Sequence, residues 1–405
     1  MNLMKLRALF WISAALVCRA SRVPSDDELR FWQQRSDRDP ADAISPARLG
    51  SAFLVLSRST GVPEWETKAD AAFRLALARD PEQLAGLVSL SALCLRRHAF
   101  AEAERLASEA IRLSPGRADG YAARGDARLE LGRIDEACED FSRVADLTPG
   151  LAARSRLAHL RWLTGHRDEA CSLLGSALDD VPTGADPEAV AQVKLQLGEL
   201  KFRSGDFKQA RMLYTAAAGL LPGRPAATER LAELRGAEGD LIGARQMFEG
   251  CAASTGRPEY DQAVGDLLVA AGDRAGAGPW HDRALKGYLQ AADGGDRRYD
   301  HHLATFYSDV RRDTAAAVKW ARRDHEQRQT VFTEDALAWA LHQDGQREEA
   351  GRMMARALAR GTEDAGLHFH AAMIRLAAGD KDAGRAHLAR AASLNPRYQT
   401  YHFHR

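Results

Sequence analysis

An interval of 34 residues recurs along this sequence and constrains its fold more than any other feature. Three prolines are spaced by it: Pro81, Pro115 and Pro149. Three alanines keep the same interval, each twelve residues before one of those prolines: Ala69, Ala103 and Ala137. A period between 20 and 50 residues indicates an array of small supersecondary units that bury their apolar faces only by stacking.

The composition favours helices for these units. Of the 405 residues 45% are hydrophobic, 28% are charged and only 7% are aromatic, which is a globular composition rich in helix-forming residues. Lys plus Arg and Asp plus Glu number 56 each. This balance gives no electrostatic reason to expect a nucleic-acid partner.

The clearest unit spans 118–151 and contains the phrase GRIDEACEDFSRVADLTP. Gly132 separates two amphipathic halves and suits the left-handed conformation that ends a helix. Pro149 stops the second half. Small Gly125 and Ala137 allow the two helices to approach closely, and Phe141 fills the space towards the next unit. The phrase returns as GHRDEACSLLGSALDDVP and GDFKQARMLYTAAAGLLP.

This pattern resembles the tetratricopeptide repeat (TPR) family over most of the chain. The resemblance implies an all-α fold, a right-handed α-solenoid of about ten helix-turn-helix units. Repeats 1–4 are expected over 50–184, repeats 5–7 over 191–291 and repeats 8–10 over 297–398. Residues 21–49 are expected to form an N-terminal capping helix and linker, with Ser25 and Glu28 as a capping box, and 399–405 a C-terminal tail. The unit 297–330 is the most irregular, because RRD replaces its turn glycine.

The first twenty residues predict export. Lys5 and Arg7 precede the apolar run ALFWISAALV and a small-residue exit, which is the pattern of a signal peptide cleaved after Ala20. A lipoprotein acylated at Cys18 is the weaker alternative. No later segment resembles a transmembrane helix. The mature protein is therefore expected in the periplasm or outside the cell.

The sequence contains no standard catalytic phrase. GxxxxGK[ST], HExxH, GxSxG and a strand-associated GxGxxG are all absent, so we expect no enzyme activity and no cofactor. Histidines gather late in the chain, as His301-His302, His368-Phe369-His370 and His402-Phe403-His404. Neighbouring helical residues diverge by about 100°, so these sets alone do not predict a metal site.

The family resemblance also implies which side chains line the concave groove, namely positions 2, 5, 9, 12 and 13 of each unit. In the middle units these are mostly acidic: Asp119, Asp126, Glu130, Glu199, Glu229, Glu233, Glu259 and Asp266. Bases in the same register there are Arg203 and His159. Such an imbalance predicts a basic or polar partner segment.

Aromatic side chains at the same positions predict anchors for that partner. The later groove set consists of Arg298, His301, Phe332, Trp339, His342 and Phe369. In family members that bind chaperone C-termini, a Lys/Asn clamp on the first helix holds the carboxylate. Asparagine occurs here only at Asn2 and Asn395, so that clamp cannot form.

These features predict a non-enzymatic scaffold that binds a protein or peptide segment in a concave groove. The final third, with ALAWALHQDGQ and LHFHAAMIRLAAGD, also resembles exported bacterial repeat proteins without an assigned activity. Two alternatives stay open from the sequence. One is a metal-binding or metal-dependent protein that uses the His-rich C-terminal region, and the other is a structural protein that associates with itself through its C-terminus.

Overall fold

The computed structural model describes residues 23–398, all of whose regular structure is helical, so the all-α class is confirmed. The expected signal segment 1–20 and the tail 399–405 lie outside the described residues. The helices are α1 (Asp26–Arg38), α2 (Ile44–Thr60), α3 (Glu64–Arg79), α4 (Leu84–Arg96), α5 (Phe100–Leu113), α6 (Ala118–Glu130), α7 (Ile134–Leu147), α8 (Leu151–Leu163), α9 (Arg167–Asp179), α10 (Pro187–Arg203), α11 (Phe207–Leu220), α12 (Pro225–Ala237), α13 (Leu241–Thr255), α14 (Pro258–Ala270), α15 (Arg274–Asp293), α16 (Asp300–Phe306), α17 (Thr314–Gln327), α18 (Val331–Gln343), α19 (Arg347–Ala359), α20 (Ala365–Ala377) and α21 (Lys381–Leu394), with a π-helix, η2 (Tyr307–Arg311), after α16.

After α1 the helices form ten consecutive antiparallel pairs, from α2 with α3 to α20 with α21. We call these pairs units 1 to 10. Each pair stacks on the next, which confirms the α-solenoid. None of the helices between residues 23 and 398 combines the length and the apolar composition that a bilayer crossing requires.

A small residue on the first helix of a unit meets a large one on the second. A Cβ added to Gly125 would lie 2.6 Å from the ring of Phe141, and one added to Gly198 would lie 2.5 Å from the ring of Tyr214. Both rings are fully buried. The glycines therefore set the close approach within each unit, and the large side chain contributes the apolar area that stabilises it.

The turn between the two helices of a unit contains one left-handed residue. It is a glycine in eight units: Gly61, Gly132, Gly165, Gly205, Gly239, Gly272, Gly345 and Gly379. In unit 8, where RRD replaces the glycine, Arg312 takes this conformation with φ 56°, directly after the π-helix. In unit 2 the buried His98 takes it with φ 59°, which was not anticipated from the sequence.

The N-terminal part begins with the expected extra helix, α1. The Ser25 hydroxyl accepts a hydrogen bond from the Glu28 amide at 3.3 Å and caps it. The first pair starts at Ile44 rather than at residue 50. There the Asp42 carboxylate accepts hydrogen bonds from the amides of Ile44 and Ser45, at 2.8 and 3.0 Å, and starts α2 earlier than the 34-residue register suggests.

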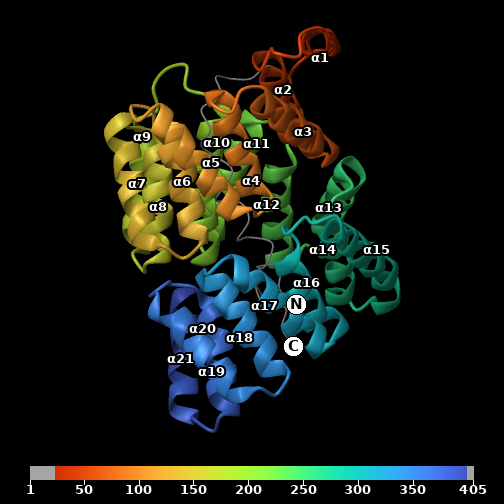
Figure 1. Cartoon of the computed structure of the whole chain (residues 1–405). Helices are drawn as coiled ribbons and strands as arrows, with labels where there is room; N and C mark the ends of the chain where they lie inside the picture. Colours follow the sequence, from red (N-terminus) through yellow and green to blue (C-terminus); the bar gives the residue numbers. More distant parts are fainter. Residues whose placement is uncertain (1–22, 399–405) are drawn as a thin grey trace.

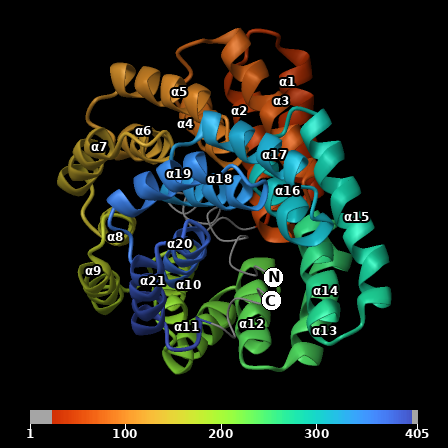
Figure 2. The same cartoon turned by 90° about the horizontal axis from the view of Figure 1, so that it is seen from below.

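The solenoid makes a full superhelical turn within five units, so its second turn rests on its first. In Figure 1 helices α17 to α21, in blue, lie below the orange and yellow helices α4 to α9, and Figure 2 shows the ring that α4 to α15 follow. The turn glycine of a unit contacts the end of the unit five places later. The contacts are Gly61 with Thr255, Gly132 with Gln329, Gly165 with Gly361, and Gly205 with Asn395.

Gly165→Ala and Gly345→Ala form a matched test of this stacking. Both glycines have left-handed φ angles, 85° and 79°, so alanine costs about 1–2 kcal/mol at either. A Cβ at position 165 would also lie 2.5 Å from the Gly361 carbonyl oxygen, whereas nothing lies within 4 Å at position 345.

We expect Gly165→Ala to lower the free energy of unfolding by about 1–3 kcal/mol more than Gly345→Ala, because a backbone carbonyl must move aside. Urea unfolding followed by circular dichroism measures both variants. Equal losses would show that the second turn does not rest on the first at this position.

Candidate functional site

The acidic side chains expected in the groove do face inward, but they are buried. Asp119 is half-buried and pairs with Arg117. The other seven are between 2% and 8% exposed: Asp126, Glu130, Glu199, Glu229, Glu233, Glu259 and Asp266. The expectation of a solvent-facing acidic surface therefore fails, because the curvature of the solenoid brings these positions together in its interior.

Arginines outside the groove positions neutralise several of these acids. The guanidinium of Arg156 donates to both carboxylate oxygens of Asp126, at 2.9 and 2.8 Å. Arg230 pairs with Glu233 at 2.9 Å. These arginines lie outside the groove positions, so the count of groove charges alone missed them.

The remaining partners in this region include a tyrosine hydroxyl and an imidazole. Tyr260 donates its hydroxyl to Glu229 at 3.1 Å, and His281 lies 2.9 Å from Asp266. Burial raises the pKa of Glu229 to about 7. A buried carboxylate with such partners contributes to the internal hydrogen bonding of the fold and is not accessible to a ligand.

Two polar clusters join the second superhelical turn to the first, and we call them the clasp. In one, Arg328 lies between Glu130 and Asp324, at 3.5 and 3.7 Å, and the Gln329 amide donates to the Glu130 carbonyl at 3.0 Å. Burial, together with the charge of Asp324, raises the pKa of Glu130 to about 7, although Arg328 opposes the shift.

In the second cluster of the clasp, Arg203 bridges Glu199 and Asp364 at 2.6 Å each. The Thr362 hydroxyl donates to the Leu163 carbonyl nearby. Rings accompany the charges: Phe332 lies 5.6 Å from Trp162, and the Arg203 guanidinium is 5.5 Å from the Phe332 ring. Phe332, expected as an anchor for a partner, thus packs between the two turns of the chain itself.

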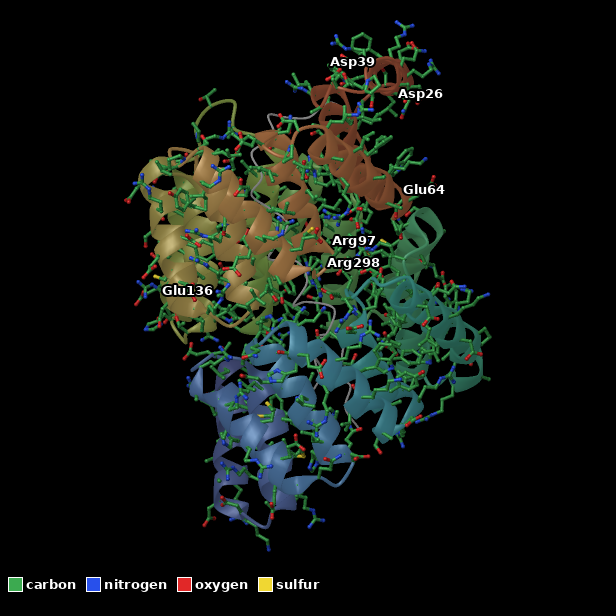
Figure 3. All side chains as sticks on the ribbon, viewed as in Figure 1. Asp26, Asp39, Glu64, Arg97, Glu136 and Arg298 are labelled. Atoms are coloured by element: carbon green, nitrogen blue, oxygen red, sulfur yellow. The ribbon has the colours of Figure 1, made fainter. Side chains whose placement is uncertain are left out.

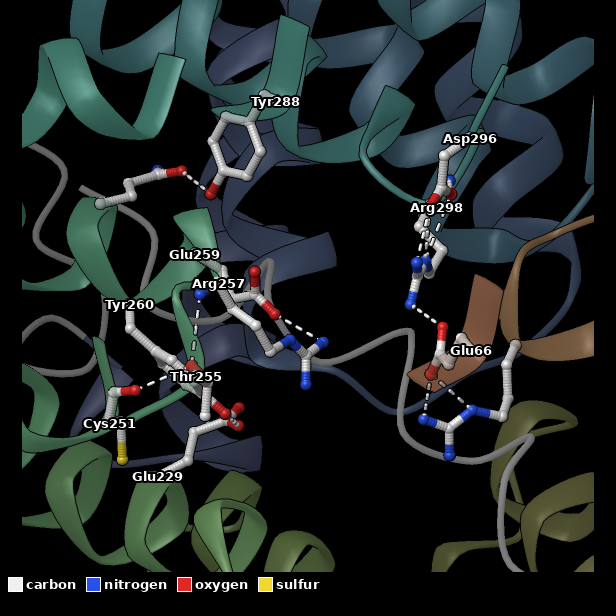
Figure 4. A network of polar contacts seen from close by, with 12 residues as sticks. Glu66, Glu229, Cys251, Thr255, Arg257, Glu259, Tyr260, Tyr288, Asp296 and Arg298 are labelled. Carbon is white, nitrogen blue, oxygen red and sulfur yellow. Dashed lines mark hydrogen bonds and ion pairs between the residues drawn. The ribbon is translucent and has the colours of Figure 1, made fainter. Parts of the chain in front are cut away.

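Arg298 is held in a third contact between the turns, which Figure 4 shows from close by. Its guanidinium binds Glu66 at 2.7 Å and Asp296 at 2.6 Å. Burial opposes ionisation of Glu66, but Arg96 and Arg298 outweigh it and lower the pKa of this carboxyl to about 2. Figure 3 places Arg298 near the middle of the molecule, far from Asp26 on α1. Arg298 is therefore committed to the fold.

The adjacent His301 and His302 point in different directions, as their helical spacing predicts. His301 lies 2.9 Å from the buried carboxylate of Asp324. His302 packs against the rings of Tyr288 and Tyr299, at 5.4 and 5.6 Å, and burial lowers its pKa to about 3. His301, expected as a groove contact, is only 4% exposed and belongs to the clasp.

The concave face of α18 and α20 differs from that of units 3 to 7 because several side chains there are only half-buried. Trp339 itself is buried, at 9% exposure, and stacks on His370 with ring centroids 4.4 Å apart. Half-buried His342 lies 5.4 Å from Trp339. Half-buried Phe369 contacts Tyr398 at 6.2 Å. We call this face the α18–α20 groove.

Two further groove positions of α20 were not singled out from the sequence. Positions 9 and 12 of this unit are half-buried Met373 and Leu376, which is 36% exposed. They stand in the same register as Phe369, but they are neither aromatic nor charged. No cluster of three or more His, Cys, Asp or Glu side chains suited to a metal ion occurs between residues 23 and 398.

A sequence signal for the clasp exists at position 32 of each unit. The first five units have proline there: Pro81, Pro115, Pro149, Pro182 and Pro222. Units 8 and 9 have Arg328 and Thr362 instead, and both of these side chains reach the first turn. Units 6 and 7 also lack this proline, and unit 10 keeps it as Pro396 although its neighbour Asn395 lies against Gly205. Position 32 therefore marks two residues of the clasp and does not mark the stacking as a whole.

The comparison with known proteins agrees with this architecture. Residues 118–150 match the family model of the tetratricopeptide repeat, so unit 3 is similar to that repeat and the chain as a whole is an α-solenoid. No curated protein matches the sequence.

Several solved repeat structures are similar to the chain. The human IFIT1 dimer with PPP-AAAA has a TM-score of 0.47 at 12% identity, over 91% of this chain and 95% of that one. The APC/C hetero-tetramer Cut9–Hcn1 has a TM-score of 0.44 at 14% identity, over 93% and 80%. A thermophilic TPR protein of Thermus thermophilus has a TM-score of 0.36 at 20% identity, over 43% and 89%. A shared repeat fold does not define function.

The raised pKa of Glu130 gives the clasp a pH dependence. The folded state holds this proton more tightly than the unfolded chain, whose glutamate has a pKa near 4.5. The stability contributed by Glu130 is therefore present below pH 4.5 and is lost as the pH rises through 7. Glu130→Gln removes this titration.

We expect Glu130→Gln to gain stability relative to the unmodified protein by about 1–3 kcal/mol between pH 5 and pH 8. Denaturant unfolding of both proteins at the two pH values measures the difference. If the two proteins lose stability in parallel over this range, Glu130 is not buried as the structure describes.

Proposed function

We propose that this chain is a non-enzymatic scaffold that holds a protein or peptide segment in the α18–α20 groove. The observation that carries the proposal is the contrast between units 3 to 7 and units 9 and 10. In units 3 to 7 all but one of the eight acidic groove residues are buried and engaged with the chain itself. At groove positions of α18 and α20, His342 and Met373 are half-buried and Leu376 is 36% exposed.

The chemistry of this groove favours an amphipathic partner segment with apolar side chains at its centre. Half-buried Phe369 supplies a large rigid face, and such side chains dominate the energetics of interfaces. Trp339 is only 9% exposed, so its ring supports this surface from within. The acidic groove residues of units 3 to 7 do not contribute to its recognition, because nearly all of them are buried and engaged inside the fold. The partner therefore need not be basic, as the sequence alone suggested.

A charge introduced at the α18–α20 groove tests the proposal. Leu376 suits this test because it is not part of the clasp. Leu376→Glu places a carboxylate at the groove, whereas Met212→Glu places one on α11, where Met212 is 64% exposed. A photo-crosslinking residue at position 373 captures the partner in cells of the source organism, and the partner is then purified for binding measurements.

We expect Leu376→Glu to weaken binding of the purified partner at least tenfold, which is about 1.4 kcal/mol, because an apolar contact gains a charge that must be desolvated. Met212→Glu should bind as the unmodified protein does. Titration calorimetry measures both. Equal affinities of the two variants would exclude the α18–α20 groove as the binding surface.

We further propose that the scaffold acts after export, on the basis of the basic and apolar pattern of residues 1–20. The mature protein should then begin at Ser21. Mass spectrometry of the N-terminal peptide, from protein purified out of its own cells, measures this. A peptide that retains residues before Ser21, without lipid on Cys18, would contradict cleavage after Ala20.

A further inference from the structure

The last helix pair brings together two histidines that are 19 residues apart in the sequence. His368 lies in the first turn of α20 and His387 in the middle of α21. Their Nδ1 atoms are 3.0 Å apart, and the ring centroids are 5.2 Å apart. The two residues are not neighbours in the sequence, so no local pattern relates His387 to His368.

We propose that His368 and His387 form a binding site for a divalent transition-metal ion. Imidazole nitrogens bind such ions at about 2.0–2.1 Å, so two ligands of one ion lie about 2.9–3.4 Å apart at bond angles of about 90–110°. The observed 3.0 Å separation of the two Nδ1 atoms falls in this range. The two nitrogens share a hydrogen bond in this structure, so metal binding requires that the donor ring moves its proton to Nε2 and that both rings turn their Nδ1 lone pairs to a common point.

The surroundings distinguish this pair from the structural histidines of the chain. His281, His301 and His370 each lie within 3.0 Å of a carboxylate, which fixes the ring in the interior. Both members of the pair are half-buried, so an ion and its waters can reach them. The nearby Arg390 guanidinium pairs with Glu363 at 2.7 Å, which offsets its charge.

The chemical class of the ion follows from the ligands. Neutral imidazole suits Zn²⁺, Ni²⁺ and Cu²⁺, whereas Ca²⁺ and Mg²⁺ require oxygen ligands. With two protein ligands, the other coordination positions are filled by water. The bound ion would connect α20 to α21 and stabilise this pair, because a ligand that binds only the folded state raises its stability.

Titration of the purified full chain, carrying no affinity tag, with ZnCl₂ tests the site. We expect one ion per chain by calorimetry, and a melting temperature that rises with zinc concentration. His387→Ala and His387→Gln should each weaken the binding at least tenfold. The Gln variant keeps a polar side chain of similar length, so that loss of folding does not decide the outcome.

Two full-chain controls complete the experiment. His166→Ala removes an exposed histidine of another unit, and the double variant His402→Ala/His404→Ala removes the tail histidines. Both should bind zinc as the unmodified protein does. Absence of binding, binding that survives both His387 variants, or binding lost in the tail variant would each overturn the proposal.

Discussion

The contact between the turn glycines of the first superhelical turn and the units five places later determines which groove positions of this molecule are buried. At Gly132, Gly165 and Gly205 the backbone of one turn lies against groups of the next. A side chain larger than glycine at these points would hold the turns apart. The interior is closed because this approach is close, and its closure explains why so many charged groove positions are buried.

Burying those charges has a cost that the fold offsets by pairing them. A charge without a partner in such an interior costs several kcal/mol, whereas a well-placed pair roughly balances its own desolvation. Arg203, Arg230 and Arg328 each face two or more carboxylates. The clasp therefore contributes specificity of register between the two turns, and the apolar contacts around Trp162 contribute the greater part of its stability.

The sequence predicted what depends on local spacing and missed what depends on superhelical pitch. The 34-residue period, the turn glycines and the small–large pairing of Gly125 with Phe141 all act within one unit, so the ten helix pairs could be derived. Which groove positions face solvent depends on how far the chain has turned after five units. No local pattern of the sequence shows this, because Arg328 and Thr362 replace the proline at position 32 in two stacked units whereas Pro396 keeps it in a third.

The candidate binding surface lies at the end of the described chain for the same reason. The first-turn groove is closed to a partner because Phe332, Arg328 and Asp364 of the second turn occupy it. The turn glycines of units 9 and 10, Gly345 and Gly379, have nothing within 4 Å of an added Cβ, so no further turn within residues 23–398 covers these units. The concave face of α18 and α20 is thus not covered by another unit, and the clasp fixes these two helices to the first superhelical turn. A partner that binds there meets a surface whose shape is already set, and loses little affinity to reorganisation of the scaffold.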